Sequence, residues 1–197
     1  MLSFAHMLRF HTIIGKNHIN SPMTYKLQNA KILIVDDMVP MQTLLRSLLG
    51  IFGFRDIEIA RNGEEGFEKY CMFQPDLVLA DWIMSPIDGI EMTQMIRNDP
   101  RSPNRFTPII LMTGYSSRMH VEEARDKGVT EFVVKPFTAR DLFSKLEHII
   151  EKPRQFVDAD SFFGPDRRRR NKEDFEGGAK RNADHRPKKP SFTDTKD

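Results

Sequence analysis

The 197-residue sequence has a single cysteine, Cys71, and lacks a long apolar run. One cysteine excludes an intrachain disulfide and predicts a reducing compartment. No apolar stretch approaches the ~18 residues that span a bilayer. Residues 1–14 alternate apolar side chains with His and Arg instead of forming the uninterrupted apolar core of a secretory signal. We therefore expect a cytoplasmic protein with no membrane span.

Negative charge is absent from the N-terminal region. Residues 1–29 carry three basic and no acidic side chains, residues 30–150 carry 14 and 18, and residues 151–197 carry 13 and 10. An acidic middle between basic ends fits a folded domain with solvated arms better than a uniformly basic nucleic-acid binder. We predict a disordered arm over residues 1–29. An amphipathic helix that touches a membrane and an upstream extension before a start at Met23 are the alternatives.

The middle of the chain, residues 30–150, alternates short apolar strands with amphipathic helices five times. The predicted strands are residues 31–35, 56–60, 76–80, 108–112 and 131–134, and the predicted helices are residues 39–53, 62–73, 89–98, 116–128 and 138–151. Strands that are apolar throughout, each followed by a helix, predict a doubly wound α/β domain with a parallel sheet covered on both faces. In such sheets ligands bind at the carboxyl ends of the strands.

Charged and polar side chains stand where these strands end. Asp36 and Asp37 follow the first strand, Asp81 the third, Thr113 the fourth and Lys135 the fifth. Three carboxylates at one sheet edge repel one another and need a cation, and oxygen ligands with open positions suit Mg²⁺. With a hydroxyl and an ammonium group nearby, the set predicts a phosphoryl-transfer site in which Asp81 is the acceptor.

Four segments in this order resemble a known family. ILIVDD (residues 32–37), DWIMSPIDG (81–89), MTG (112–114) and KPF (135–137) are similar to the motifs of receiver domains in two-component response regulators. The resemblance covers residues 30–150. It implies a flavodoxin-like five-stranded sheet in the order 2-1-3-4-5, within a stand-alone, chemotaxis-regulator-like receiver that carries a short basic tail.

The resemblance also implies how the phosphoryl group is received. Asp81 would take it from the phosphohistidine of a sensor histidine kinase or of a phosphotransfer protein. Asp36, Asp37, Asp81 and the backbone carbonyl of Ile83 would hold Mg²⁺. Beyond its own Mg²⁺-dependent phosphorylation and dephosphorylation, the chain is not expected to be an enzyme.

Further residues have implied roles in the response to phosphorylation. Thr113 and Lys135 would contact phosphoryl oxygens, and Thr113 with Phe132 would form the switch. The resemblance implies a cis bond between Lys135 and Pro136, whereas the general frequency of ~5–6% for cis X-Pro bonds favours trans.

The sequence departs from the family in the loop after Asp81. Ser85 stands where the family often has proline, and the proline here is Pro86. Ile83 and Tyr115 are bulky side chains at the two positions that tune the access of water in the family. We hypothesise that this pair slows self-dephosphorylation.

Residues 151–197 lose the periodicity and are rich in charge, Pro and Gly, which predicts a disordered tail. Residues 162–167 within it are either a docking motif or part of a solubilising arm. Acidic residues at 173, 174 and 176 argue against strong nucleic-acid binding by the basic run at 167–170.

We expect a receiver that signals through contacts with a downstream protein whose identity the sequence does not give, over residues 118–150. A phosphorelay intermediate, a phosphate sink and a nucleic-acid-binding regulator remain alternatives. A Mg²⁺-dependent phosphohydrolase is disfavoured, because Ile83 stands in the place of the second aspartate of its Asp-x-Asp loop.

Overall fold

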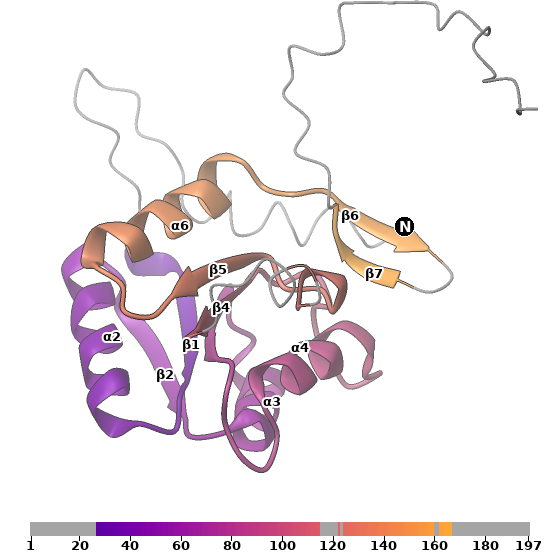
Figure 1. Cartoon of the computed structure of the whole chain (residues 1–197), viewed down its shortest axis with the longest axis horizontal. Coiled ribbons are helices and arrows are strands. Elements are labelled where there is room, and N and C mark those ends of the chain that lie inside the picture. Colours follow the sequence, from indigo (N-terminus) through magenta and orange to yellow (C-terminus); the bar gives the residue numbers. More distant parts are fainter. Residues whose placement is uncertain (1–26, 115–121, 123, 160–161, 167–197) are drawn as a thin grey trace, which may run out of the picture. The chain divides into compact units, whose positions relative to one another are not determined.

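The computed structural model of the chain describes residues 27–114, 122, 124–159 and 162–166 (Figure 1). Residues 1–26 of the predicted N-terminal arm, most of the predicted helix at 116–128 and residues 167–197 lie outside these ranges. The last three residues of that arm are ordered as a 3₁₀ turn, because Leu27 is buried in the core, so the prediction of disorder is wrong there. Among the described residues, no helix is both long and apolar enough to cross a bilayer.

A five-stranded parallel sheet forms the centre of the domain. Its strands are β1 (Lys31–Val35), β2 (Asp56–Ala60), β3 (Leu77–Asp81), β4 (Ile109–Thr113) and β5 (Glu131–Val134), in the order β2-β1-β3-β4-β5. The predicted α/β class and strand order are therefore confirmed. β3 and β4 each end one residue later than predicted, so Asp81 and Thr113 belong to their strands. β3 and β4 are buried along their whole length, as fully apolar strands require.

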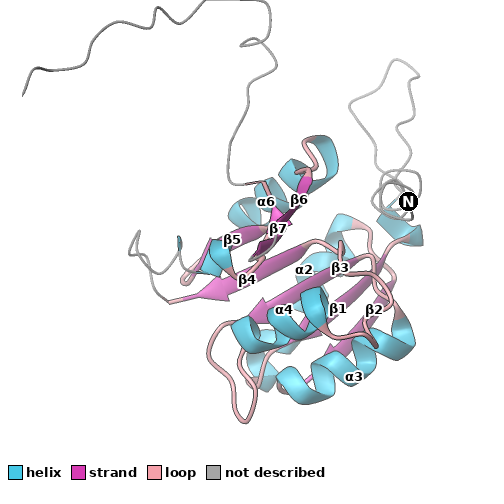
Figure 2. Cartoon of the chain, turned by 90° about the vertical axis from the view of Figure 1, so that its right-hand side faces the viewer, coloured by secondary structure: helices cyan, strands magenta, loops and turns pink. Residues whose placement is uncertain are grey.

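Helices cover both faces of the sheet (Figure 2). After the short 3₁₀ turn η1 (Leu27–Asn29), the described helices are α2 (Val39–Phe52), α3 (Gly63–Phe73), α4 (Gly89–Asn98) and α6 (Ala139–Glu151). Ile32 and Ile34 of β1 belong to the same apolar core as side chains of α2 and α6, while Leu33 and Val35 belong to the core that contains side chains of α3 and α4. Alternate residues of one buried strand thus build two separate apolar cores.

The helix boundaries follow local signals. Asn62 opens α3 by accepting a hydrogen bond from the backbone of Glu65. Asp88 and Glu91 form a capping box at the start of α4. Gly53 ends α2 with a φ of 108°, a left-handed conformation that favours glycine.

The chain continues past residue 150 into a second, two-stranded antiparallel sheet, β6 (Phe156–Ala159) and β7 (Phe162–Pro165). The prediction of disorder from residue 151 is wrong for this hairpin. Isolated two-stranded hairpins are marginal in water. The sequence of this segment alone does not indicate what stabilises the hairpin. Its support is a long-range contact, because the rings of Phe156 and Phe163 pack on Phe106, in the loop between α4 and β4.

Candidate functional site

The predicted site residues meet at the carboxyl edge of the sheet. The parallel pairing of β1 with β3, of β3 with β4 and of β4 with β5 aligns the ends of these strands. Asp36, Asp81 and Thr113 therefore stand on neighbouring strands. The backbone N–H of Lys135 donates to the Thr113 carbonyl oxygen at 2.7 Å, which places the lysine beside the threonine.

Three carboxylates gather at this edge. One oxygen each from Asp36, Asp37 and Asp81 lies within 4.8 Å of the other two. Asp36 is fully buried, Asp81 nearly so, and Asp37 is exposed. Burial raises the pKa of Asp36 and the charge on Asp81 raises it further, against the lowering effects of the Met38 N–H and the Lys135 ammonium. Carboxylates this close repel one another and favour a cation between them.

Lys135 supplies part of that positive charge. Its Nζ lies 2.9 Å from Asp81 Oδ1 and 3.5 Å from Asp36 Oδ2, so one ammonium group bridges two carboxylates. The backbone N–H of Trp82 donates to the same Asp81 oxygen at 2.8 Å. The Asp81 side chain is thus held through Oδ1 by a lysine and an amide.

The carboxylate oxygens of this cluster are suitable ligands for a hard divalent cation. Asp36 Oδ2 is buried and has no hydrogen-bond donor among the described residues, although the Lys135 ammonium is nearby. A buried carboxylate oxygen of this kind costs free energy unless a cation or a donor reaches it. Together with the exposed Asp37, the cluster matches the ligands of an ion that keeps several waters.

Gly89 holds the loop after β3 close to the strand. Its N–H donates to the Trp82 carbonyl oxygen at 3.0 Å. A Cβ at this position would collide with the Asp81 carbonyl oxygen and lie 2.8 Å from Leu111 Cδ1. Only glycine permits this approach, so the Asp-Gly turn sets the path of the chain beside Asp81.

The remaining predicted residues have different surroundings. Ile83 is 59% exposed, and Thr113 is fully buried. Phe132 is half-buried and packs on the core under α3 and α4. Tyr115 lies outside the described residues, so its role in limiting the access of water stays a prediction.

Two X-Pro bonds within the described ranges are cis, Lys135–Pro136 and Ser85–Pro86. The first is the isomer that the family resemblance implies, and the expectation from general frequencies is wrong there. The second was not predicted, because no local signal distinguishes it from an ordinary X-Pro bond.

Sequence reasoning missed Gln42. Its Nε2 donates to the Asp36 carbonyl oxygen at 2.6 Å, and the side chain is buried. The available signal was a polar residue on the face of a predicted helix that otherwise carries leucines. The bond fixes the backbone of the first carboxylate.

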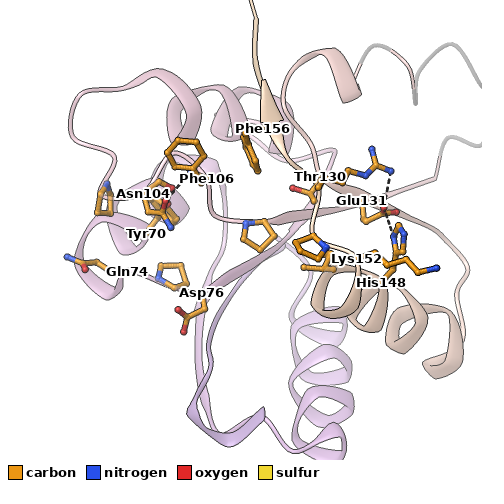
Figure 3. Close-up of a pocket in the computed structure, with 16 residues that line it drawn as sticks. Tyr70, Gln74, Asp76, Asn104, Phe106, Thr130, Glu131, His148, Lys152 and Phe156 are labelled. Atoms are coloured by element: carbon orange, nitrogen blue, oxygen red, sulfur yellow. Dashed lines mark hydrogen bonds and ion pairs between the residues drawn. The ribbon is translucent and has the colours of Figure 1, made fainter. Parts of the chain in front are cut away.

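A separate cavity of about 60 Å³ lies at the other end of the sheet, where β3, β4 and β5 begin (Figure 3). On its wall the buried Glu131 lies 2.9 Å from His148 Nδ1 and accepts a hydrogen bond from Arg154 at 3.1 Å, while Lys145 Nζ is 3.5 Å away. None of the predicted site residues lines this cavity.

The fold and the acidic edge define a receiver-type domain, and the chain belongs to that family. Residues 32–147, more than half of the chain, match the response regulator receiver domain. The predicted family resemblance is confirmed.

Its relatives include chemotaxis regulators. The chain is 34% identical to the chemotaxis protein CheY-3 of Vibrio cholerae over 125 residues, 64% of this chain and 95% of that protein. It is 34% identical to the chemotaxis protein CheY of Pseudomonas aeruginosa over 122 residues, 62% of this chain and 97% of that protein. These similarities are consistent with phosphorylation-dependent signalling.

Solved structures agree on the fold. CheY4 of Vibrio cholerae matches with a TM-score of 0.56 and 28% identity, over 61% of this chain and 98% of that one. A complex of CheX with CheY, BeF₃ and Mg²⁺ from Borrelia burgdorferi matches with a TM-score of 0.57 and 26% identity, over 63% and 91%.

Proposed function

We propose that this chain is a signalling receiver that accepts a phosphoryl group on Asp81 from the phosphohistidine of a histidine kinase or phosphotransfer protein. The observation that carries the proposal is the ion pair of 2.9 Å between Lys135 Nζ and Asp81 Oδ1, inside a cluster of carboxylates at the carboxyl edge of a receiver fold. A buried carboxylate with a cation already in contact is suited to become a nucleophile toward phosphorus.

We propose Mg²⁺ as the cation of this site. Asp36, Asp37, Asp81 and the backbone carbonyl of Ile83 would hold it. When bound, Mg²⁺ neutralises charge on the phosphoryl oxygens during transfer. The presence of Mg²⁺ beside CheY in the Borrelia burgdorferi complex supports this choice.

The side chains around Asp81 have distinct proposed roles. The Lys135 ammonium would pair with one phosphoryl oxygen, since it already contacts the acceptor carboxylate. The Thr113 hydroxyl, at the end of the neighbouring strand, would donate a hydrogen bond to another. Movement of Thr113 toward the phosphoryl group would leave room for Phe132 to turn inward, which changes the surface that a partner contacts.

The output of the domain is proposed to be a protein contact in the cytoplasm. Ile83 and Tyr115 would slow the loss of the phosphoryl group by hindering water, as their bulk suggests. A slow loss would give the phosphorylated chain time to find its partner.

The test is phosphorylation by acetyl phosphate in the presence of Mg²⁺, followed by intact mass. Wild type should gain one phosphoryl group, and the gain should disappear in Asp81→Asn or when EDTA removes Mg²⁺. Asp56→Asn, at an exposed position on β2, is the matched control and should behave like wild type. If wild type gains no mass from acetyl phosphate or from phosphoramidate, the proposal is wrong.

A further inference from the structure

The hairpin of β6 and β7 is attached to the domain by side chains. The two strands form a sheet of their own, separate from the five-stranded sheet (Figure 1). Because an isolated pair of strands is marginal in water, the surface beneath the hairpin must supply much of its order. That surface therefore has affinity for β6 and β7.

Aromatic rings make the first part of this contact. The centroid of Phe106, in the loop between α4 and β4, lies 5.3 Å from Phe156 and 5.1 Å from Phe163. Phe156 and Phe163 are 5.5 Å apart. Both pairs with Phe106 are edge-to-face, the arrangement that aromatic quadrupoles favour.

Two arginines make the second part. Arg97 Cζ lies 5.1 Å from the ring centroid of Phe156, and Arg105 Cζ lies 3.4 Å from that of Phe163. Each guanidinium group thus faces one ring of the hairpin, a favourable cation–π contact. We call Arg97, Arg105 and Phe106 the arginine surface.

Arg97 is an unusual residue to bury. It is 1% exposed, and its Nε and Nη1 donate to the carbonyl oxygens of Gly128 and Arg105 at 3.1 and 2.9 Å. Burial lowers its pKa to about 9, which leaves it charged at neutral pH. One ring of the hairpin, Phe156, therefore lies against a buried cation.

The arginine surface has donors that the hairpin does not use. Arg97 Nη2 and Arg105 Nε are buried and have no hydrogen-bond acceptor among the described residues. Donors of this kind are costly to bury without an acceptor. A ligand with well-placed carboxylate or carbonyl oxygens would satisfy them better than the hairpin does.

The composition of the hairpin matches this surface. Residues 156–166 contain three aspartates and three phenylalanines but no lysine or arginine. A segment of acidic and aromatic composition thus carries the two rings, Phe156 and Phe163, that contact a basic, aromatic surface. Just before it, Arg154 is tied to the buried Glu131 by a contact of 3.1 Å, which keeps the segment close to its site.

We propose that the arginine surface is a recognition site for an acidic, phenylalanine-containing segment of a partner protein, and that residues 156–166 occupy the site until such a partner displaces them. The chain's own hairpin defines the aromatic part of the ligand, phenylalanine rings for the two guanidinium faces, and the donors that it leaves unused define the acidic part. The proposal does not depend on phosphorylation of Asp81.

The experiment measures binding of a fluorescein-labelled peptide with the sequence of residues 154–166 to the full chain by fluorescence anisotropy. Occupation by the attached hairpin reduces the apparent affinity in proportion to the fraction of free sites. Wild type should bind weakly, and Phe156→Ala/Phe163→Ala, which weakens the hairpin but keeps the arginine surface, should bind about tenfold more tightly.

Two controls connect the binding to the arginine surface. Adding Arg105→Ala to the double variant should remove the gain, whereas Arg140→Ala, an exposed arginine on α6, should not. A peptide with alanine in place of Phe156 and Phe163 should bind neither protein.

Equal affinity for wild type and the double variant would overturn the proposal, as would binding that survives Arg105→Ala. If circular dichroism shows the double variant to be unfolded, Arg154→Ala loosens the attachment without removing a ring, and the same comparisons apply. Dimerisation of wild type that Arg105→Ala abolishes would assign the site to the hairpin of a second copy and overturn the assignment to a partner protein.

Discussion

Lys135 and Asp81 form an ion pair of 2.9 Å although their strands are not neighbours. β4 lies between β3 and β5, so the lysine side chain reaches across the end of β4, where Thr113 stands. The same Nζ is 3.5 Å from Asp36 on the far side. One ammonium group therefore connects the ends of β1, β3 and β5, and the threonine lies inside that span.

Replacing Lys135 with methionine should weaken both the fold and the chemistry. Asp36 and Asp81 would lose their shared cation. We expect the free energy of unfolding, measured with urea at pH 7 without Mg²⁺, to fall by about 1–3 kcal/mol. Phosphorylation by acetyl phosphate should slow by about 10²-fold, the typical effect of losing one positioned donor. Lys127→Met, at an exposed position, is the control and should change neither. An unchanged phosphorylation rate would contradict the proposed role of Lys135 in phosphoryl transfer.

Replacing glycine with alanine at two positions should change the free energy of unfolding in opposite directions. Gly89→Ala places a methyl group against the Asp81 carbonyl oxygen, and we expect a loss of about 1–3 kcal/mol in the free energy of unfolding. Gly50→Ala, in α2, meets nothing within 4 Å and should stabilise the protein by about 0.5–1 kcal/mol because alanine favours the helix. Urea denaturation measures both. A neutral Gly89→Ala would show that the loop after β3 can move away from the strand.

Glu65 should contribute to stability in a pH-dependent way. The backbone N–H of Arg61 donates to its carboxylate, and this bond, with that from Lys69, lowers the pKa of Glu65 below its ordinary value of 4.5. The stabilisation is therefore present above pH 4.5 and is lost as the pH falls through the lower folded-state pKa. Glu65→Gln should flatten this part of the stability profile.

The control for this effect is Glu64→Gln, at the exposed neighbouring position, which should keep the wild-type profile. Thermal unfolding followed between pH 3 and 6 distinguishes the two variants. Identical profiles for Glu65→Gln and Glu64→Gln would mean that the hydrogen bond from Arg61 does not contribute to stability.

Ile83→Asn should shorten the lifetime of the phosphorylated protein severalfold. The Ile83 side chain is exposed next to the acceptor, and a smaller polar side chain would admit and orient water. Loss of phosphoryl mass with time after removal of acetyl phosphate measures the lifetime. Ile51→Asn, at an exposed position of α2 away from the site, is the control. An unchanged or longer lifetime in Ile83→Asn would contradict the proposed role of this bulk.

The sequence alone determined the α/β class and the gathering of Asp36, Asp81 and Thr113. The reason is that these features depend on local patterns: apolar strands of about five residues, helices with their own caps, and polar residues directly after each strand. A parallel sheet then brings the strand ends together whatever the details of packing. The family motifs added the cis bond at Pro136, which frequency alone contradicts.

Only the tertiary structure decided that the segment after residue 150 forms an ordered hairpin. Phe156 and Phe163 contact each other within the hairpin, but the surface that they pack on, Phe106 and the two arginines, lies about 50 to 60 residues earlier in the chain. The sequence presents Arg97 as an ordinary polar residue near the end of a helix, and only the structure shows it buried, with bonds to the carbonyl oxygens of Gly128 and Arg105. Such contacts depend on which surfaces meet after the sheet has formed, and neither hydrophobic periodicity nor local propensity records that.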